Sequence, residues 1–126
     1  MSDARSNLQV AKDQQGHAGA TVLTITGELD LATIGVLKDA VGAELDVKTA
    51  PVILDLSDLT FCDSTGLGSF VALHRQAAAA GTVIALAGPR KRVADLLQIS
   101  GINQVVPVFE SVTEAVATQA TAPPAA

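Results

Sequence analysis

Apolar and polar residues follow one another in patterns that predict strands first and then alternating strands and helices. Residues 21–26 alternate with a period of two, which is typical of a strand. Together with residues 8–12 and the turn-forming residues between the two segments, they predict a hairpin. Further along, apolar residues recur at three- and four-residue steps, which predicts a helix that buries one face. Those residues are Ile34, Leu37, Val41 and Leu45.

The second half of the chain repeats a pattern of strand and then helix. Residues 52–54 form an apolar run between Pro51 and a predicted turn at residues 55–58, as in a strand that is buried on both faces. The elements expected after it are a helix over 64–80, a strand over 83–86, a helix from Pro89 to Gly101, a strand over 105–108 and a helix from Ser111 to about Thr118.

This order of elements predicts an α/β fold. Strands that alternate with helices from residue 51 onward imply parallel strands with right-handed crossovers, entered by an antiparallel N-terminal strand. We therefore expect a mixed sheet of four to five strands with about four helices. The domain should span residues 8–119, with a disordered leader over 1–7 and a disordered tail over 120–126.

Composition and charge exclude several classes of function. The 126 residues suffice for one domain, and no apolar stretch approaches the roughly 20 residues that cross a bilayer. The single cysteine cannot form an internal disulfide, and residues 1–7 lack the apolar core of a secretory signal, so we expect a cytoplasmic protein without a membrane partner. A net charge of −5, with three Phe and no Trp or Tyr, argues against direct contact with nucleic acid.

The most distinctive chemistry lies where the central strand meets the next helix. Asp63, Ser64 and Thr65 are good acceptors for the unpaired amides of a first helical turn, and Gly66 and Gly68 keep side-chain bulk off that turn. Because a helix N-terminus accommodates negative charge, a phosphate on Ser64 would not unfold the domain. In the alternative interpretation, Ser64 only caps the helix, which is worth about 1 kcal/mol.

The same serine does not fit a hydrolase. The Gly-x-Ser-x-Gly pattern of a nucleophile elbow is broken, because Cys62 occupies the first glycine position. His74 lies ten residues along the same predicted helix, about 15 Å from Ser64, and His17 lies in the hairpin turn. We therefore predict no catalytic residue. His74 is expected to be packed and hydrogen-bonded, and Cys62 to be a buried free thiol.

Three other signals suggest ligands only weakly. Gly66 and Gly68 imitate a dinucleotide fingerprint, but Val71 stands where its third glycine belongs. The carboxylates of Asp55, Asp58 and Asp63 would suit a metal site or a receiver domain. A receiver needs a lysine after its last strand, and no lysine follows Lys91. These carboxylates are therefore more simply explained as turn and cap residues. We expect no cofactor and no metal. The basic run at residues 90–92 is explained by a solvated face more simply than by contact with an acidic partner.

Three segments together resemble one known family. Residues 61–68, Phe-Cys-Asp-Ser-Thr-Gly-Leu-Gly, resemble the signature of the STAS domain, and specifically of bacterial anti-sigma factor antagonists. Residues 27–30, Gly-Glu-Leu-Asp, resemble the motif that follows the family's second strand, and residues 93–102 resemble its third helix. The three segments stand in the family's order and spacing.

The resemblance implies a STAS fold and a regulatory function. Members bind an anti-sigma factor, a protein serine kinase, and so release a sigma factor; phosphorylation by that kinase ends the interaction, and a phosphoserine phosphatase restores it. Carried over, the phosphoacceptor is Ser64, and the residues expected to contact the partner are Glu28, Asp30, Asp63, Thr65 and Gly66. The alternative is a STAS scaffold subunit of a stress-signalling complex that is never reversibly modified.

Overall fold

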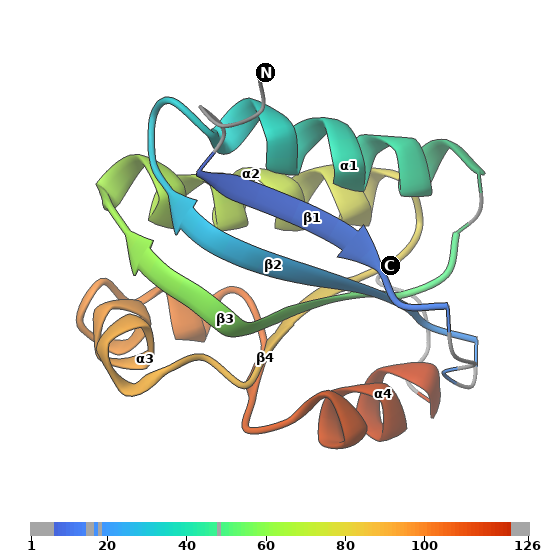
Figure 1. Cartoon of the computed structure of the whole chain (residues 1–126). Coiled ribbons are helices and arrows are strands. Elements are labelled where there is room, and N and C mark those ends of the chain that lie inside the picture. The colour runs from blue at the N-terminus through green and yellow to red at the C-terminus, as the bar shows by residue number, and fades with distance from the viewer. Residues whose placement is uncertain (1–6, 15–16, 18, 48, 122–126) are drawn as a thin grey trace.

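The computed structural model describes residues 7–14, 17, 19–47 and 49–121 (Figure 1). Within these residues the strands are β1 (Leu8–Lys12), β2 (Thr21–Leu29), β3 (Val52–Cys62), β4 (Ile84–Ala87) and β5 (Val108–Phe109). The helices are α1 (Ile34–Val47), α2 (Ser64–Ala79), α3 (Lys91–Ile99), the short 3-10 helix η2 (Ile102–Gln104) and α4 (Val112–Thr121).

The strands form one mixed sheet. Their order is β1-β2-β3-β4-β5, with β1 antiparallel to β2 and every later pair parallel. The predicted mixed sheet with an antiparallel N-terminal strand is therefore confirmed. None of the helices in the described residues has the length and apolar character that a bilayer crossing requires.

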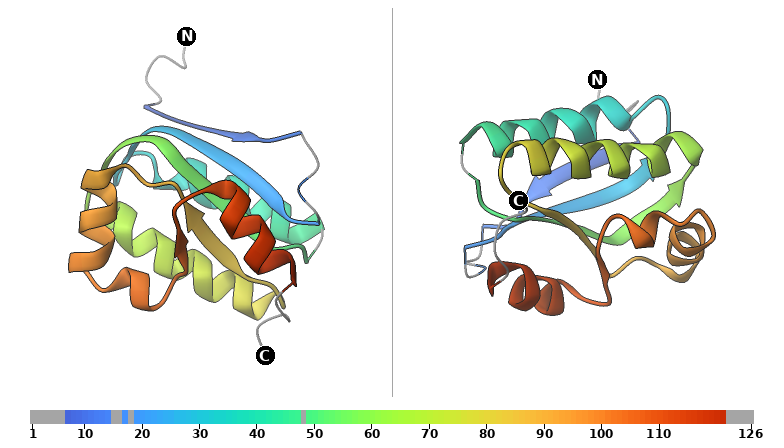
Figure 2. Two further views of the ribbon diagram at one scale, coloured as in Figure 1. Left: turned by 90° about the horizontal axis from the view of Figure 1, so that it is seen from below. Right: turned by 180° about the vertical axis from the view of Figure 1, so that it is seen from behind.

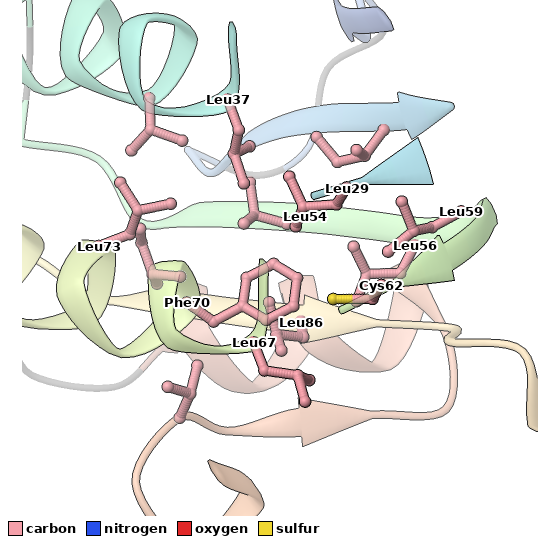
Figure 3. Packing of buried hydrophobic residues seen from close by; sticks show 14 of the residues in the cluster. Leu29, Leu37, Leu54, Leu56, Leu59, Cys62, Leu67, Phe70, Leu73 and Leu86 are labelled. Carbon is pink, nitrogen blue, oxygen red and sulfur yellow. The ribbon is translucent and has the colours of Figure 1, made fainter. Parts of the chain in front are cut away.

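The helices cover the two faces of the sheet unequally (Figures 1 and 2). On one face, α1 and α2 lie together over the larger buried cluster, where Phe70 packs among leucines from the sheet and from both helices (Figure 3). On the opposite face, α4 covers a smaller cluster that includes Val22, Ile53 and Ala85. The larger cluster continues to the carboxyl end of β3, where Leu59 and Cys62 are buried.

The predicted turn at residues 55–58 is wrong, because β3 runs without interruption from Val52 to Cys62. Thr24 pairs with Asp55, whereas Thr26 pairs with Asp58, so β3 carries an extra residue as a β-bulge. A second register shift follows Gly27. These bulges break the alternation of period two, so that the middle of one long strand resembles a turn in the sequence.

Residues 27–30, which were expected to follow the strand over 21–26, belong in part to that strand. Gly27 has a φ of +114°, and a Cβ there would overlap the carbonyl oxygen of Asn7, so only glycine fits. The strand continues beyond it, and Glu28 pairs with Phe61. Asn7, which was assigned to the leader, accepts a hydrogen bond from the Glu28 amide at 2.7 Å. The rest of the predicted leader, residues 1–6, lies outside the described residues.

The C-terminal third differs from the prediction in detail. α3 begins at Lys91, two residues after the predicted Pro89. The strand predicted over 105–108 is largely wrong: Gly101, at φ +81°, leads into η2, and β5 contains only Val108 and Phe109. α4 extends to Thr121, three residues beyond its predicted end. Residues 122–126 of the predicted tail lie outside the described residues.

Candidate functional site

The N-terminus of α2 is held by Asp63, the residue between β3 and the helix. Its backbone is extended, and its carboxylate accepts a hydrogen bond from the Gly66 amide at 2.8 Å. Its own amide donates to the Leu29 carbonyl at 3.2 Å, which ties the junction to the end of β2. Asp63 is therefore the N-cap, and the interpretation in which Ser64 caps α2 is wrong.

Ser64 is the first residue of α2, and its side chain is free. It is exposed, and its hydroxyl makes no hydrogen bond to any residue that the structure describes. The first helical turn contains no acidic residue. The hydroxyl thus stands in solvent at the positive end of a 16-residue helix.

Gly66 presses the first turn of α2 onto the sheet. It is buried, and a Cβ there would lie 2.7 Å from the Leu29 carbonyl oxygen and 2.8 Å from the Cys62 sulfur. Gly68, two residues further along the helix, has open space where its Cβ would be. The prediction that both glycines keep bulk off the turn therefore holds for Gly66 alone. A direct contact between Gly66 and a partner stays a prediction.

Cys62 lies beneath this turn as a buried free thiol, as predicted. Burial, and then the charge of Asp63, raise the pKa of the thiol from its ordinary value of 9.0 to about 12. The sulfur is therefore protonated at neutral pH, and the structure gives it a packing role rather than a nucleophilic one.

Two further carboxylates lie beside the junction. Because β2 and β3 are parallel and Leu29 pairs with Cys62, Glu28 and Asp30 reach the same edge of the sheet as Asp63. Glu28 is exposed. Asp30 accepts hydrogen bonds from the amides of Ala32 and Thr33 at 3.0 and 3.2 Å, so it also caps the turn before α1.

The partner-binding residues predicted from the sequence thus lie around one rim, and two apolar side chains join them. Thr65 is half-buried in the first turn of α2. Leu31 is 73% exposed and Phe61 is 43% exposed, and sequence reasoning did not predict either as part of a site. An apolar residue in the turn after Asp30 was the available signal for Leu31. No such signal exists for Phe61, because the bulges in β3 obscure which face of the sheet it occupies.

Neither histidine is arranged to activate Ser64. His17 contacts the Asp13 carboxylate at 2.9 Å in the N-terminal hairpin. His74 is partly buried, but its Nδ1 has no hydrogen-bond partner within the described residues, so the expectation of a hydrogen-bonded histidine is wrong for that atom.

The Asp55 carboxylate accepts hydrogen bonds from the amide and the hydroxyl of Ser57. No group of three or more potential metal ligands forms in the described part of the chain.

Comparison with known proteins identifies a STAS domain over nearly the whole chain. The family model for the STAS domain matches residues 11–115. The anti-sigma F factor antagonist of Paenibacillus polymyxa is 26% identical over 106 residues, which cover 83% of this chain and 89% of that protein.

Two solved structures share the fold. An anti-sigma factor antagonist from Mycobacterium paratuberculosis superposes with a TM-score of 0.77 at 20% identity, over 89% of this chain and 93% of that one. The Bacillus cell fate determinant SpoIIAA in its phosphorylated form superposes with a TM-score of 0.63 at 20% identity, over 87% of this chain and 98% of that one.

Proposed function

This chain belongs to the STAS domain family, and we propose that it is an anti-sigma factor antagonist that is switched off by phosphorylation of Ser64. In the unphosphorylated state it binds an anti-sigma factor, which then releases a sigma factor in the cytoplasm. The anti-sigma factor is a serine kinase that phosphorylates the antagonist, and a phosphoserine phosphatase returns it to the active state. Both the anti-sigma F factor antagonist and the phosphorylated protein of the same fold support this proposal.

The observation that carries the proposal is the free hydroxyl of Ser64 at the start of a capped helix. Asp63 already binds the Gly66 amide, and its carbonyl accepts from the Leu67 amide, so the cap does not need the serine. The amides of Ser64 and Thr65 have no acceptor among the described residues. A phosphate would meet these two donors and the positive helix end without breaking a hydrogen bond of the fold.

The charges around the rim explain how a phosphate would act on a partner. Glu28, Asp30 and Asp63 already make this edge acidic, and a phosphoserine adds about −1.5 to −2 charges. An anti-sigma factor would dock over these three carboxylates together with Ser64 and Thr65. After phosphorylation it would meet a surface that is changed in both charge and shape. The core beneath the rim would be unchanged, so binding is lost while the fold remains.

A phosphorylation assay tests the proposal. The full chain is incubated with ATP and each candidate anti-sigma kinase of the source genome, and its intact mass is measured. We expect the addition of one phosphate, which disappears in Ser64→Ala. The matched control is Ser111→Ala, which alters another exposed serine at a helix start and should leave phosphorylation unchanged. A complex that forms without any phosphate transfer would instead support the scaffold alternative.

Loss of binding is tested with the same kinase. Ser64→Asp places a negative charge at the modified position, and it should abolish the complex that wild-type protein forms, as judged by gel filtration or calorimetry. Undiminished binding by Ser64→Asp would contradict the proposed switch.

A further inference from the structure

A hollow opens between the end of β3 and α3, beside the junction that holds Ser64. Its volume is about 110 Å³, and it is lined by Thr60, Phe61, Cys62, Arg92, Val93 and Leu96. Cys62 and Val93 are almost fully buried, whereas Phe61 is 43% exposed. The hollow therefore has an apolar base and an aromatic edge that is open to solvent.

Arg92 contributes the only charged side chain of this lining. It is the last of three consecutive cations, and the other two have partners: Arg90 Nε donates to the Ser57 carbonyl at 2.9 Å, and Lys91 Nζ contacts the Asp95 carboxylate at 2.8 Å. Arg92 is exposed and has neither a hydrogen bond nor a carboxylate partner within the residues that the structure describes. Its guanidinium is thus available to an anion from outside the molecule.

Folding alone does not account for a cation at this position. Arg92 stands in the first turn of α3, where the helix dipole disfavours positive charge, and that turn has no acidic residue to offset it. The N-cap, Arg90, makes no side-chain hydrogen bond to the helix. The charge of Arg92 therefore gains nothing from the helix dipole or from an acidic neighbour in the first turn of α3.

The hollow and Ser64 belong to one surface. Cys62 lines the hollow, and Ser64 follows two residues later, so their Cα atoms are at most about 7 Å apart. Phe61 pairs with Glu28 on β2 and shares the hollow with Arg92 of α3. The surface thus has an acidic side on β2 and a basic side on α3, with an exposed aromatic ring between them.

We propose that the hollow receives an apolar side chain of the anti-sigma partner that stands next to a carboxylate on the same partner. The apolar group would pack between Phe61 and Leu96, and the carboxylate would bind the guanidinium of Arg92, whose planar donors match a carboxylate. A cavity that holds one water molecule needs a volume of about 10–15 Å³. The hollow, at about 110 Å³, is therefore large enough for a small branched aliphatic group. The identity of the partner rests on the proposed function, whereas the chemistry of the occupant rests on the hollow and its unpaired cation.

A pair of small probes tests this chemistry without a partner protein. We would titrate the isotope-labelled full chain with 4-methylpentanoate, and separately with 3-methylbutylamine, which carries the same isopropyl group and the opposite charge. The carboxylate should shift the amide signals of Cys62, Val93 and Leu96, and it should bind about threefold more tightly than the amine, as expected for an exposed charge pair. Equal binding of the two probes, or no shift at these amides, would overturn the proposal.

Charge reversal supplies the control. Arg92→Glu should make the amine the better ligand, whereas Arg75→Glu, which alters an exposed arginine of α2 outside the hollow, should leave the preference for the carboxylate unchanged. With a kinase identified by the phosphorylation assay, Arg92→Glu should weaken the complex at least about tenfold. An unchanged affinity would refute the proposed contact even if Ser64 is phosphorylated. Absence of phosphate transfer to wild-type protein would count against the proposed function and not against the probe result.

Discussion

The N-termini of α2 and α4 both carry an exposed serine, but they use it differently. At α4, the Ser111 hydroxyl accepts a hydrogen bond from the Glu114 amide at 3.1 Å, and the Glu114 carboxylate in turn accepts from the Glu110 amide at 3.0 Å. At α2, the corresponding bond is made by the Asp63 carboxylate. Ser64 stands one position further along and makes no such bond to any described residue.

The difference shows that a serine at a helix start can be a structural cap or a side chain without a bond to the helix, depending on a shift of one residue. A phosphate on Ser111 would disturb the oxygen that holds the Glu114 amide. A phosphate on Ser64 would leave the bond from Gly66 to Asp63 intact. The start of α2 can thus be modified without losing its cap, whereas the start of α4 cannot.

The largest expected difference in stability lies beneath α2, at Gly66. Gly66→Ala would force a methyl group against the Leu29 carbonyl oxygen and the Cys62 sulfur, and we expect it to lower the free energy of unfolding by about 3 kcal/mol. Urea unfolding followed by circular dichroism measures the change. Gly68→Ala is the matched control, because its Cβ meets no atom within 4 Å; it should be neutral or stabilise the helix by up to about 1 kcal/mol. Equal stability of the two variants would show that α2 is not pressed onto the strands.

Alkaline pH should destabilise the core beneath α2 and leave the core beneath α4 unaffected. The raised pKa of Cys62 means that, above pH 9, the unfolded thiol ionises while the folded thiol keeps its proton. Stability from this group is therefore complete below pH 9 and is lost as pH rises toward 12, by about 1 kcal/mol between pH 8 and pH 10. The cluster under α4 contains only apolar residues and has no such group among the described residues.

Urea unfolding at the two pH values measures this loss, and Cys62→Ala is the control. The chain has no tyrosine, so lysine titration is the main change that both proteins share in this range. If Cys62→Ala shows the same loss of stability as wild-type protein, the thiol is not its source.

The two caps themselves should be worth similar amounts. Asp63→Ala and Ser111→Ala each remove a side-chain acceptor from a helix amide, and each should cost about 1 kcal/mol in thermal or urea unfolding. Asp63→Asn keeps an oxygen acceptor and should retain most of the stability. If Ser111→Ala costs nothing while Asp63→Ala is costly, the hydrogen bond at α4 does not stabilise that helix and the comparison fails.

Much of the fold could be predicted because burial leaves a periodic pattern in the sequence. α1 and α2 follow from apolar residues spaced three and four positions apart, and Gly81, at φ +84°, ends α2 as predicted. The continuity of β3 could not be predicted, because its bulges shift Leu59 and then Cys62 out of the alternation that Val52, Leu54 and Leu56 follow, while all of them remain buried. Register shifts of this kind depend on the neighbouring strand, which the local pattern does not reveal.

The candidate site was predictable in its location and less so in its geometry. The run from Asp63 to Gly66 identified the helix start, but which of its polar residues caps the helix depends on the residue at which β3 stops. The hollow could not be predicted, because Phe61 and Leu96 come from segments 35 positions apart that only the folded sheet brings together. Arg92 looked like one of three equivalent cations until the partners of Arg90 and Lys91 were known.

The smallest expected effect on stability is the one that most directly separates the two serines. Ser64→Ala removes a hydroxyl that bonds to no described residue, so it should change the free energy of unfolding by less than about 0.5 kcal/mol, against about 1 kcal/mol for Ser111→Ala. Ser64→Asp adds a negative charge at the positive end of α2 and should stabilise the protein by about 0.3–1 kcal/mol at low ionic strength.

Both Ser64 variants are measured by urea unfolding at low and high salt, since screening should remove the gain of Ser64→Asp and leave Ser64→Ala unaffected. A cost of about 1 kcal/mol for Ser64→Ala would mean that the hydroxyl shares in the cap, and phosphorylation would then have to break a bond of the fold. A neutral Ser64→Ala combined with a stabilising Ser64→Asp would mean that the helix start tolerates negative charge and gains from it. Any loss of partner binding in Ser64→Asp could then be assigned to the docking surface, because the folded state would be no less stable than in wild-type protein.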